Sequence, residues 1–194
     1  MIRTQRALLT LLITLLLSPA AWGNGTSAPE DYRERLASYY NHKQYDHFTA
    51  LMDTALPYFA ANGLWENYYY TRYMHVEQYI FGNRTEQAMA QADSIYRMAN
   101  DAGHDYGRAI ALQLMALAYG YGMENGDRAA ETLHEAIALL QSHDRPEYLK
   151  LYIKLHSTLV QTLMNTLRYE SPALMSDSIE PILHHWESTL DRLE

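Results

Sequence analysis

Apolar residues recur at helical intervals along most of the chain, and short polar breaks interrupt them about every 20 residues. The breaks lie near residues 41–42, 62–63, 82–83, 100–103, 120–126, 142–146 and 169–172. Strict alternation of apolar and polar residues, which is typical of strands, is almost absent. The pattern predicts an all-α protein with about eight helices of roughly 15–18 residues and no sheet.

Two segments show this pattern most clearly. Residues 109–119 are apolar on nearly every side, which predicts a helix that is buried on two sides. In residues 129–140, a polar face with Glu131, His134 and Glu135 lies opposite an apolar face. That apolar face consists of Ala129, Ala130, Leu133, Ala136, Ile137 and Leu140.

Helices of this length joined by short turns form antiparallel hairpins, and a hairpin of two such helices spans about 40 residues. When the units are aligned, small or apolar residues recur on the second helices at relative positions 0, 4 and 7. The three sets are Phe48, Met52 and Ala55; Ala88, Ala92 and Ile95; and Ala129, Leu133 and Ala136. On the first helices a tyrosine recurs at the same interval, as Tyr39, Tyr79 and Tyr119. The period predicts an α-solenoid of three to four repeats, with units at about 31–62, 63–102, 103–144 and 145–194.

In these positions the chain resembles the tetratricopeptide-repeat family. The third unit matches best, through Ala116, Tyr119, Ala129, Leu133 and Ala136. The first two units match in part, through Leu36, Tyr39, Tyr45 and Ala55 and through Val76, Tyr79 and Ala88. The resemblance implies a right-handed, TPR-like α-solenoid that binds partners in a concave groove.

The chain also departs from this family. Its units are about 40 residues long instead of 34, and Ala60, Asn100 and Gln141 stand where the family usually has proline. In the last unit Pro181 interrupts the helical pattern, so it either begins a separate helix or belongs to an atypical cap.

A second and more specific resemblance concerns the order of the leader and the repeats. A leader followed by degenerate helical repeats, with phrases such as ADSIYRMANDAG, is similar to the extracytoplasmic sensor portion of Bacteroidetes-type two-component histidine kinases. In that family a transmembrane helix and a cytoplasmic output domain follow the repeats. The resemblance implies a sensor domain in signal transduction, with any kinase activity in a region outside this chain. It implies a membrane connection only through the leader or through an anchor beyond residue 194.

The first 23 residues have the features of a secretory signal peptide. Arg3 and Arg6 precede an uncharged apolar run at 7–17, and small residues follow as far as Gly23. We expect cleavage after Gly23, with cleavage after Ala20 as the alternative. The strongly apolar run is shorter than the roughly 20 residues that span a bilayer, which argues against an uncleaved anchor. The sequence therefore predicts a periplasmic protein with a short linker at 24–30.

Composition narrows the classes of function. The 194 residues include 15 basic and 23 acidic side chains, and this formal net charge of −8 argues against nucleic-acid binding. There is no cysteine, which excludes a disulfide scaffold, a thiolate nucleophile and a Cys-ligated zinc, and which suits an oxidising periplasm.

No group of residues indicates catalysis, a cofactor or a metal. The H-E-x-x-H, G-x-S-x-G, phosphate-loop and dinucleotide motifs are absent. Histidines are scattered: His42 and His47 flank a turn, and the adjacent His184 and His185 point to different helix faces. The stretch 124–127 lacks calcium-loop spacing and predicts a helix stop followed by an N-cap. We therefore expect no enzyme.

Tyrosine is the residue type that indicates a binding surface. There are 17 tyrosines, and Tyr68, Tyr69, Tyr70 and Tyr73 cluster beside Trp65. Tyrosine offers a large contact area and a hydroxyl at low rotamer cost, although such rings can equally fill wide gaps between helices. The resemblance to tetratricopeptide repeats implies a groove formed by Tyr40, Tyr70, Tyr73, Glu77, Ile80, Gln113 and Tyr121.

The sequence thus predicts a non-catalytic periplasmic domain that binds a protein or peptide partner, or a small ligand, as the sensor part of a two-component protein. The alternative is a free-standing secreted assembly scaffold. An all-α periplasmic enzyme is less well supported because no set of acid, base or metal-ligating residues is recognisable.

Overall fold

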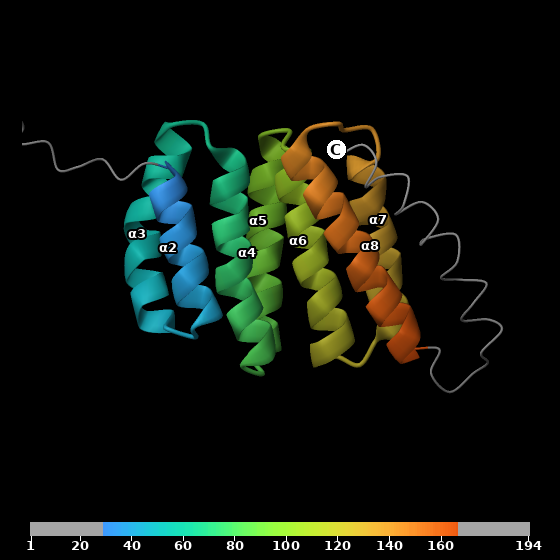
Figure 1. Ribbon diagram of the computed structural model, residues 1–194. Coiled ribbons are helices and arrows are strands. Elements are labelled where there is room, and N and C mark those ends of the chain that lie inside the picture. Colours follow the sequence, from blue (N-terminus) through green and yellow to red (C-terminus); the bar gives the residue numbers. More distant parts are fainter. Residues whose placement is uncertain (1–28, 167–194) are drawn as a thin grey trace, which may run out of the picture.

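The computed structural model describes residues 29–166 of the chain, which form an array of helices (Figure 1). The helices are α2 (Pro29–Asn41), α3 (Tyr45–Ala61), α4 (Trp65–Phe81), α5 (Thr85–Asp101), α6 (Asp105–Leu117), α7 (Gly126–Leu140) and α8 (Pro146–Thr166). A π-helical turn, η1 (Ala118–Gly122), extends α6. Residues 29–166 contain no strand, so the all-α prediction is confirmed for this part of the chain.

The six predicted breaks between residues 41 and 146 coincide with the turns between successive helices. α2 and α8 each begin with a proline, because the fixed φ and missing amide hydrogen of proline suit the first helical turn. α2 therefore starts at Pro29, inside the stretch 24–30 for which the sequence predicts a linker.

Several sequence predictions fall outside the described residues. These are the signal peptide at 1–23, the break at 169–172, Pro181, the pair His184 and His185, and the eighth helix. Of the helices within 29–166, none combines the length and the hydropathy needed to cross a bilayer.

Five of the turns contain a residue with positive φ. These residues are nearly evenly spaced along the chain, one for each helix and the turn that follows it. The five residues are Lys43, Gly63, Asn83, Gly103 and Glu124, with φ between 52° and 68°. Glycine and asparagine adopt this left-handed conformation at low cost. In addition, the carbonyls of Tyr39, Tyr79 and Tyr119 accept hydrogen bonds from the amides of Gln44, Arg84 and Asn125. The carbonyls of Tyr39 and Tyr79 thus accept from the fifth residue after them, whereas that of Tyr119 accepts from the sixth, after the π-helical turn.

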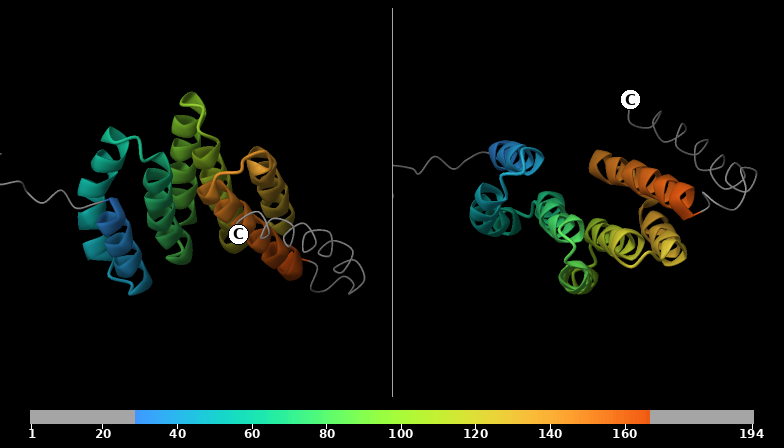
Figure 2. Two further views of the ribbon diagram at one scale, coloured as in Figure 1. Left: turned by 45° about the horizontal axis from the view of Figure 1, so that its top comes forward. Right: turned by 90° about the horizontal axis from the view of Figure 1, so that it is seen from below.

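Successive helices run antiparallel and lie side by side in a curved array (Figures 1 and 2). Viewed from below, the helices follow an arc whose open side lies between α2 and α8 (Figure 2, right). We call α2, α4, α6 and α8 the inner helices, because each contacts the next member of this set. We call α3, α5 and α7 the outer helices.

The core lies between the outer and the inner helices. All nine aligned residues of the predicted second helices are at most 8% exposed. One further position, which the alignment did not include, recurs as Phe59, Ala99 and Leu140, and each is at most 1% exposed. On the inner helices Leu36, Val76 and Ala116 follow one another at the interval of the repeat and are all buried. The period of the sequence thus corresponds to repeated packing positions.

α6 is enclosed on two sides, as its apolar sequence predicts. Ten of its 13 residues are buried, and it packs against α5 and α7 as well as α4. At Gly107, α6 lies close to both α4 and α5. A Cβ added to Gly107 would stand 2.6 Å from Cζ of Tyr69 and 2.8 Å from Cβ of Ala99. No larger residue fits there without displacing a neighbour.

Candidate binding site on the inner helices

A carboxylate held by two phenols joins α2 to α4. Tyr73 donates a hydrogen bond of 2.5 Å from its hydroxyl to Oε1 of Glu77, one turn further along α4. Tyr40 of α2 donates to the other oxygen, Oε2. Burial raises the pKa of Tyr40 well above its ordinary value, and the hydrogen bond to Glu77 raises it further. Burial, followed by the negative charge of Glu77, also raises the pKa of Tyr73, so both phenols remain donors.

Lys154 of α8 contacts two tyrosine rings beside this carboxylate. The rings of Tyr70 and Tyr73 are nearly parallel, with centroids 6.0 Å apart. The Lys154 Nζ atom lies 3.8 Å from the centroid of Tyr73 and 5.5 Å from that of Tyr70, which is cation–π geometry. Burial lowers the pKa of Lys154, and the charge of Glu77 opposes part of that shift. We call Tyr40, Tyr70, Tyr73, Glu77 and Lys154 the inner cluster.

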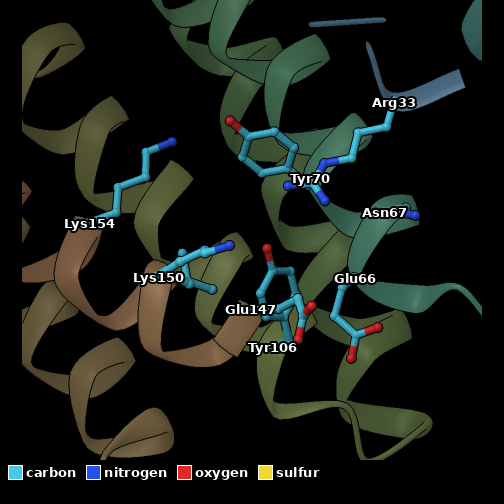
Figure 3. A pocket seen from close by; sticks show the side chains of 9 residues that line it. Arg33, Glu66, Asn67, Tyr70, Tyr106, Glu147, Lys150 and Lys154 are labelled. Atoms are coloured by element: carbon cyan, nitrogen blue, oxygen red, sulfur yellow. The ribbon is translucent and has the colours of Figure 1, made fainter. Parts of the chain in front are cut away.

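A cavity of about 200 Å³ adjoins this cluster and is lined by residues of all four inner helices. We call it the inner pocket (Figure 3). Its lining residues are Arg33, Glu66, Asn67, Tyr70, Tyr106, Glu147, Lys150, Leu151 and Lys154. Tyr70 and Lys154 therefore belong both to the inner cluster and to the wall of the pocket.

The pocket concentrates positive charge in an acidic protein. Glu66 forms an ion pair of 2.8 Å with Arg145, which does not line the pocket. Among the residues that the structure describes, Arg33, Lys150 and Lys154 have no carboxylate within ion-pair distance. The chain has only three lysines, Lys43, Lys150 and Lys154, and two of them line this pocket.

No protein-family model, curated protein or solved structure matches this chain. The assignment of a site therefore depends on the geometry of these residues.

The structure brings together four of the seven residues that the resemblance places in a groove. Tyr40, Tyr70, Tyr73 and Glu77 all belong to the inner cluster. Of these, Tyr70 lines the pocket. Tyr73 is only 2% exposed and packs into the core. Its ring therefore fills space between helices, which is the alternative that the sequence leaves open for these tyrosines.

The other three residues lie elsewhere. Ile80 is 5% exposed and belongs to the core, because its side of α4 faces neighbouring helices. Gln113 is fully buried in α6, where its Nε2 donates a 3.1 Å hydrogen bond to the hydroxyl of Thr158. Neither side chain is available to a ligand from solution, so their placement in a groove is wrong.

Tyr121 is exposed, but it lies at the end of η1 instead of in the inner pocket. Its ring packs edge-on against that of Phe81, with centroids 5.8 Å apart. It lines a second cavity of about 350 Å³ between η1 and the C-terminal half of α8. This cavity is lined mainly by small and uncharged polar groups and carries one acidic side chain, Glu124.

Sequence reasoning missed most of the pocket, including Arg33, Asn67, Tyr106, Lys150 and Lys154. One signal could have found two of them. Arg33, Tyr73, Gln113 and Lys154 follow one another at the same interval as the packing positions, so they occupy one repeat position. These four residues differ in type, so apolar periodicity alone does not reveal the repeat position that they share.

Metal-ligating groups do not gather within residues 29–166, where no three His, Asp or Glu side chains are placed to hold an ion. At the start of α6, Nε2 of His143 donates to Oδ2 of Asp105 over 2.9 Å. Arg108 donates to the other oxygen of Asp105. This arrangement joins α6 to the turn that precedes α8.

Proposed function

We propose that the chain is a non-catalytic binding domain that takes up a small ligand, or a side chain of a peptide or protein partner, in the inner pocket. The observation that supports this most is the pocket wall, to which α2, α4, α6 and α8 all contribute. We further propose that the array is a right-handed solenoid of TPR-like hairpins, in which recognition on the concave side is the expected mode.

A ligand in the pocket would contact helices that are distant in the sequence. Arg33 and Lys154 come from the first and the last helix of the arc, and both line the pocket. A ligand held by both would restrain the distance between α2 and α8, and so the curvature of the array. Such coupling of binding to shape is what a sensor domain needs.

We propose periplasmic localisation and a sensor role in a two-component signalling protein on the resemblance and on the signal-peptide pattern around Arg3 and Arg6. A free-standing secreted scaffold is the second candidate function, since it would use the same pocket to bind a partner. Both functions require a ligand that depends on the pocket, and this requirement can be tested directly.

The test is a thermal-shift screen of the purified full chain against a library of small metabolites and short peptides. We compare the native protein with Tyr70→Ala, which removes a partly exposed ring from the pocket wall. Asp93→Ala is the matched control, because Asp93 is an exposed residue of α5 and lies outside the pocket. A ligand of the pocket raises the Tm of the native protein and of Asp93→Ala, but not that of Tyr70→Ala.

Circular dichroism of Tyr70→Ala shows whether helicity is kept, so that lost binding is not confused with lost structure. Ligands that stabilise all three proteins equally bind elsewhere and contradict the proposal. A screen without any Tyr70-dependent ligand contradicts it as well.

Export is tested separately, by mass spectrometry of the N-terminus of the protein made in a host with a periplasm. A mature chain that begins at Asn24 indicates the cleavage that we propose after Gly23. A chain that begins at Ala21 supports export with the alternative cleavage, and an intact Met1 in the cytoplasmic fraction contradicts periplasmic localisation.

A further inference from the structure

Lys154 carries a charge that its surroundings do not neutralise fully. The nearest acidic group of the inner cluster is Glu77, whose charge reaches Lys154 but forms no ion pair with it. Both oxygens of Glu77 are already taken, one by the hydroxyl of Tyr40 and one by that of Tyr73. A half-buried ammonium held only by ring faces is incompletely paired, and a partly buried charge favours an additional counter-ion.

Two more cations line the inner pocket beside Lys154, whose ammonium lies over the rings of Tyr70 and Tyr73. Figure 3 shows Arg33 of α2 and Lys150 of α8 reaching from opposite sides toward the rings of Tyr70 and Tyr106. Glu147 stands beside Tyr106 in the same view, and Glu66 is engaged by Arg145. The nine lining residues carry three cations and two carboxylates, and one of these carboxylates, Glu66, is already paired with Arg145 from outside the pocket.

Apart from the charged residues and Asn67, the wall is apolar or aromatic. Leu151 and the rings of Tyr70 and Tyr106 form it, and Tyr106 and Leu151 are themselves buried. A cavity of about 150 Å³ with apolar walls is large enough for benzene. The 200 Å³ of the inner pocket therefore admits a group of that size with one small charged substituent.

We propose that the inner pocket binds a small organic monocarboxylate, with the carboxylate between Lys154, Lys150 and Arg33 and the apolar part against Tyr70 and Tyr106. This inference rests on the proposed function, because it names the class of ligand for the same pocket. The three cations favour an anionic group, and the tyrosine rings and Leu151 favour an apolar part, which inorganic phosphate lacks.

The experiment uses two probes of the same shape, 3-phenylpropionate and its neutral amide, and calorimetric titration of the full chain. We expect the acid to bind about tenfold more tightly than the amide, since charge-assisted hydrogen bonds form only with the carboxylate. Inorganic phosphate at the same concentration should not displace the acid. Equal affinity for acid and amide, or displacement by phosphate, would overturn the carboxylate assignment.

The three lysines of the chain provide both test variants and a control, because Lys150 and Lys154 line the pocket and Lys43 does not. Lys154→Gln removes the half-buried ammonium and should abolish the preference for acid over amide. Lys43→Gln is the control, because Lys43 lies in the turn between α2 and α3, outside the pocket. Arg33→Gln and Lys150→Gln change exposed side chains, so they test the pocket even if Lys154→Gln fails to fold. We expect each to weaken binding of the acid several-fold, and unchanged affinity in both would overturn the proposal.

A spectroscopic measurement adds a readout that does not depend on affinity. Protein labelled with ¹³C at lysine Cε gives one signal for each of the three lysines. The acid should shift the Lys154 and Lys150 signals and raise the pKa of Lys154, and leave Lys43 unchanged. Equal shifts of all three signals would show a non-specific ionic effect and would overturn the proposal.

The two proposals can fail separately. If 3-phenylpropionate does not bind but the thermal-shift screen yields Tyr70-dependent ligands, the carboxylate inference is wrong and the proposed function stands. If neither the probes nor the screened ligands bind in a Tyr70-dependent way, both are wrong.

Discussion

The outer helices keep apolar residues at every aligned position, whereas the inner helices keep them at some positions and vary the residue at another. On α3, α5 and α7 the aligned positions hold apolar residues throughout, and every one is at most 8% exposed. On the inner helices one repeat position holds Arg33, Tyr73, Gln113 and Lys154 in turn. Repeated apolar residues therefore mark the positions where hairpins pack on each other, and the varied position contributes to the pocket wall only at its two ends, through Arg33 and Lys154.

The difference has a physical cause. Each outer helix fits between two inner helices, so its buried side meets nearly the same surroundings in every hairpin. The inner helices border the open side of the arc (Figure 2), and their varied position is exposed at Arg33 but buried at Tyr73 and Gln113. The inner cluster and the inner pocket both lie on that side.

The largest expected effect comes from emptying a repeated outer position. Leu133→Ala removes a fully buried side chain of α7 and should lower the free energy of unfolding by about 2–5 kcal/mol. His134→Ala on the exposed face of the same helix should change it by less than about 0.5 kcal/mol. Urea denaturation measures both. Similar losses for the two variants would contradict the division into packing and exposed faces.

A second test adds volume where the inner helix α6 meets its neighbours. Gly107→Ala places a methyl group against the ring of Tyr69 and should destabilise the fold by about 1–3 kcal/mol. Gly120→Ala is the control, because its Cβ would meet only Cβ of Ala129 at an ordinary 3.7 Å. Thermal unfolding should separate the two. A Gly107→Ala protein as stable as the native one would show that this contact is not tight.

The turns and the packing positions could be predicted because their causes are local. Gly63, Asn83 and Gly103 signal left-handed turns, and apolar residues at helical spacing signal buried faces. Lys43 and Glu124 take the same conformation without a residue type that favours it. Regular spacing, and not residue type, was the signal at these two turns. The π-helical turn η1 had no local signal, because the glycines of residues 118–122 predicted only a break.

The pocket could not be predicted because its cause is not local. Lys154 of α8 meets Tyr73 of α4 although three helices separate them along the chain, and the contact depends on how far the arc curves. Curvature is the sum of small rotations between successive helices, which no short sequence pattern records. Likewise, composition could not show which of the adjacent Tyr68, Tyr69 and Tyr70 reaches the pocket.

A smaller effect on stability, with a distinct effect on binding, is expected within the inner cluster. Tyr40→Phe removes one donor from Glu77 and should cost about 1 kcal/mol, as for a typical hydrogen bond. The freed carboxylate oxygen becomes available to Lys154, so the pKa of Lys154 should rise and 3-phenylpropionate should bind less tightly. Tyr45→Phe, at a more exposed tyrosine, is the control. Weaker binding without a change in the pKa of Lys154 would contradict an effect of Glu77 on Lys154.

The smallest effect is expected where Asp105 joins the inner helix α6 to the turn after the outer helix α7. Partial burial works to raise the pKa of Asp105, but hydrogen bonds from Arg108 and His143 outweigh it, so the pKa is lowered from 3.8. A carboxyl whose pKa is lower in the folded state stabilises the fold above about pH 3.8. This contribution is lost as the pH falls through the folded pKa.

Asp105→Asn should therefore lower the free energy of unfolding by less than about 1 kcal/mol at neutral pH, because these groups are partly solvated. The difference from the native protein should shrink as the pH is lowered below about 3.8. Asp93→Asn, at an ion pair within the exposed face of α5, controls for the loss of one carboxylate. Urea denaturation at several pH values measures the difference. If it stayed constant down to pH 2, packing at this junction, and not the charge of Asp105, would join the two sets of helices.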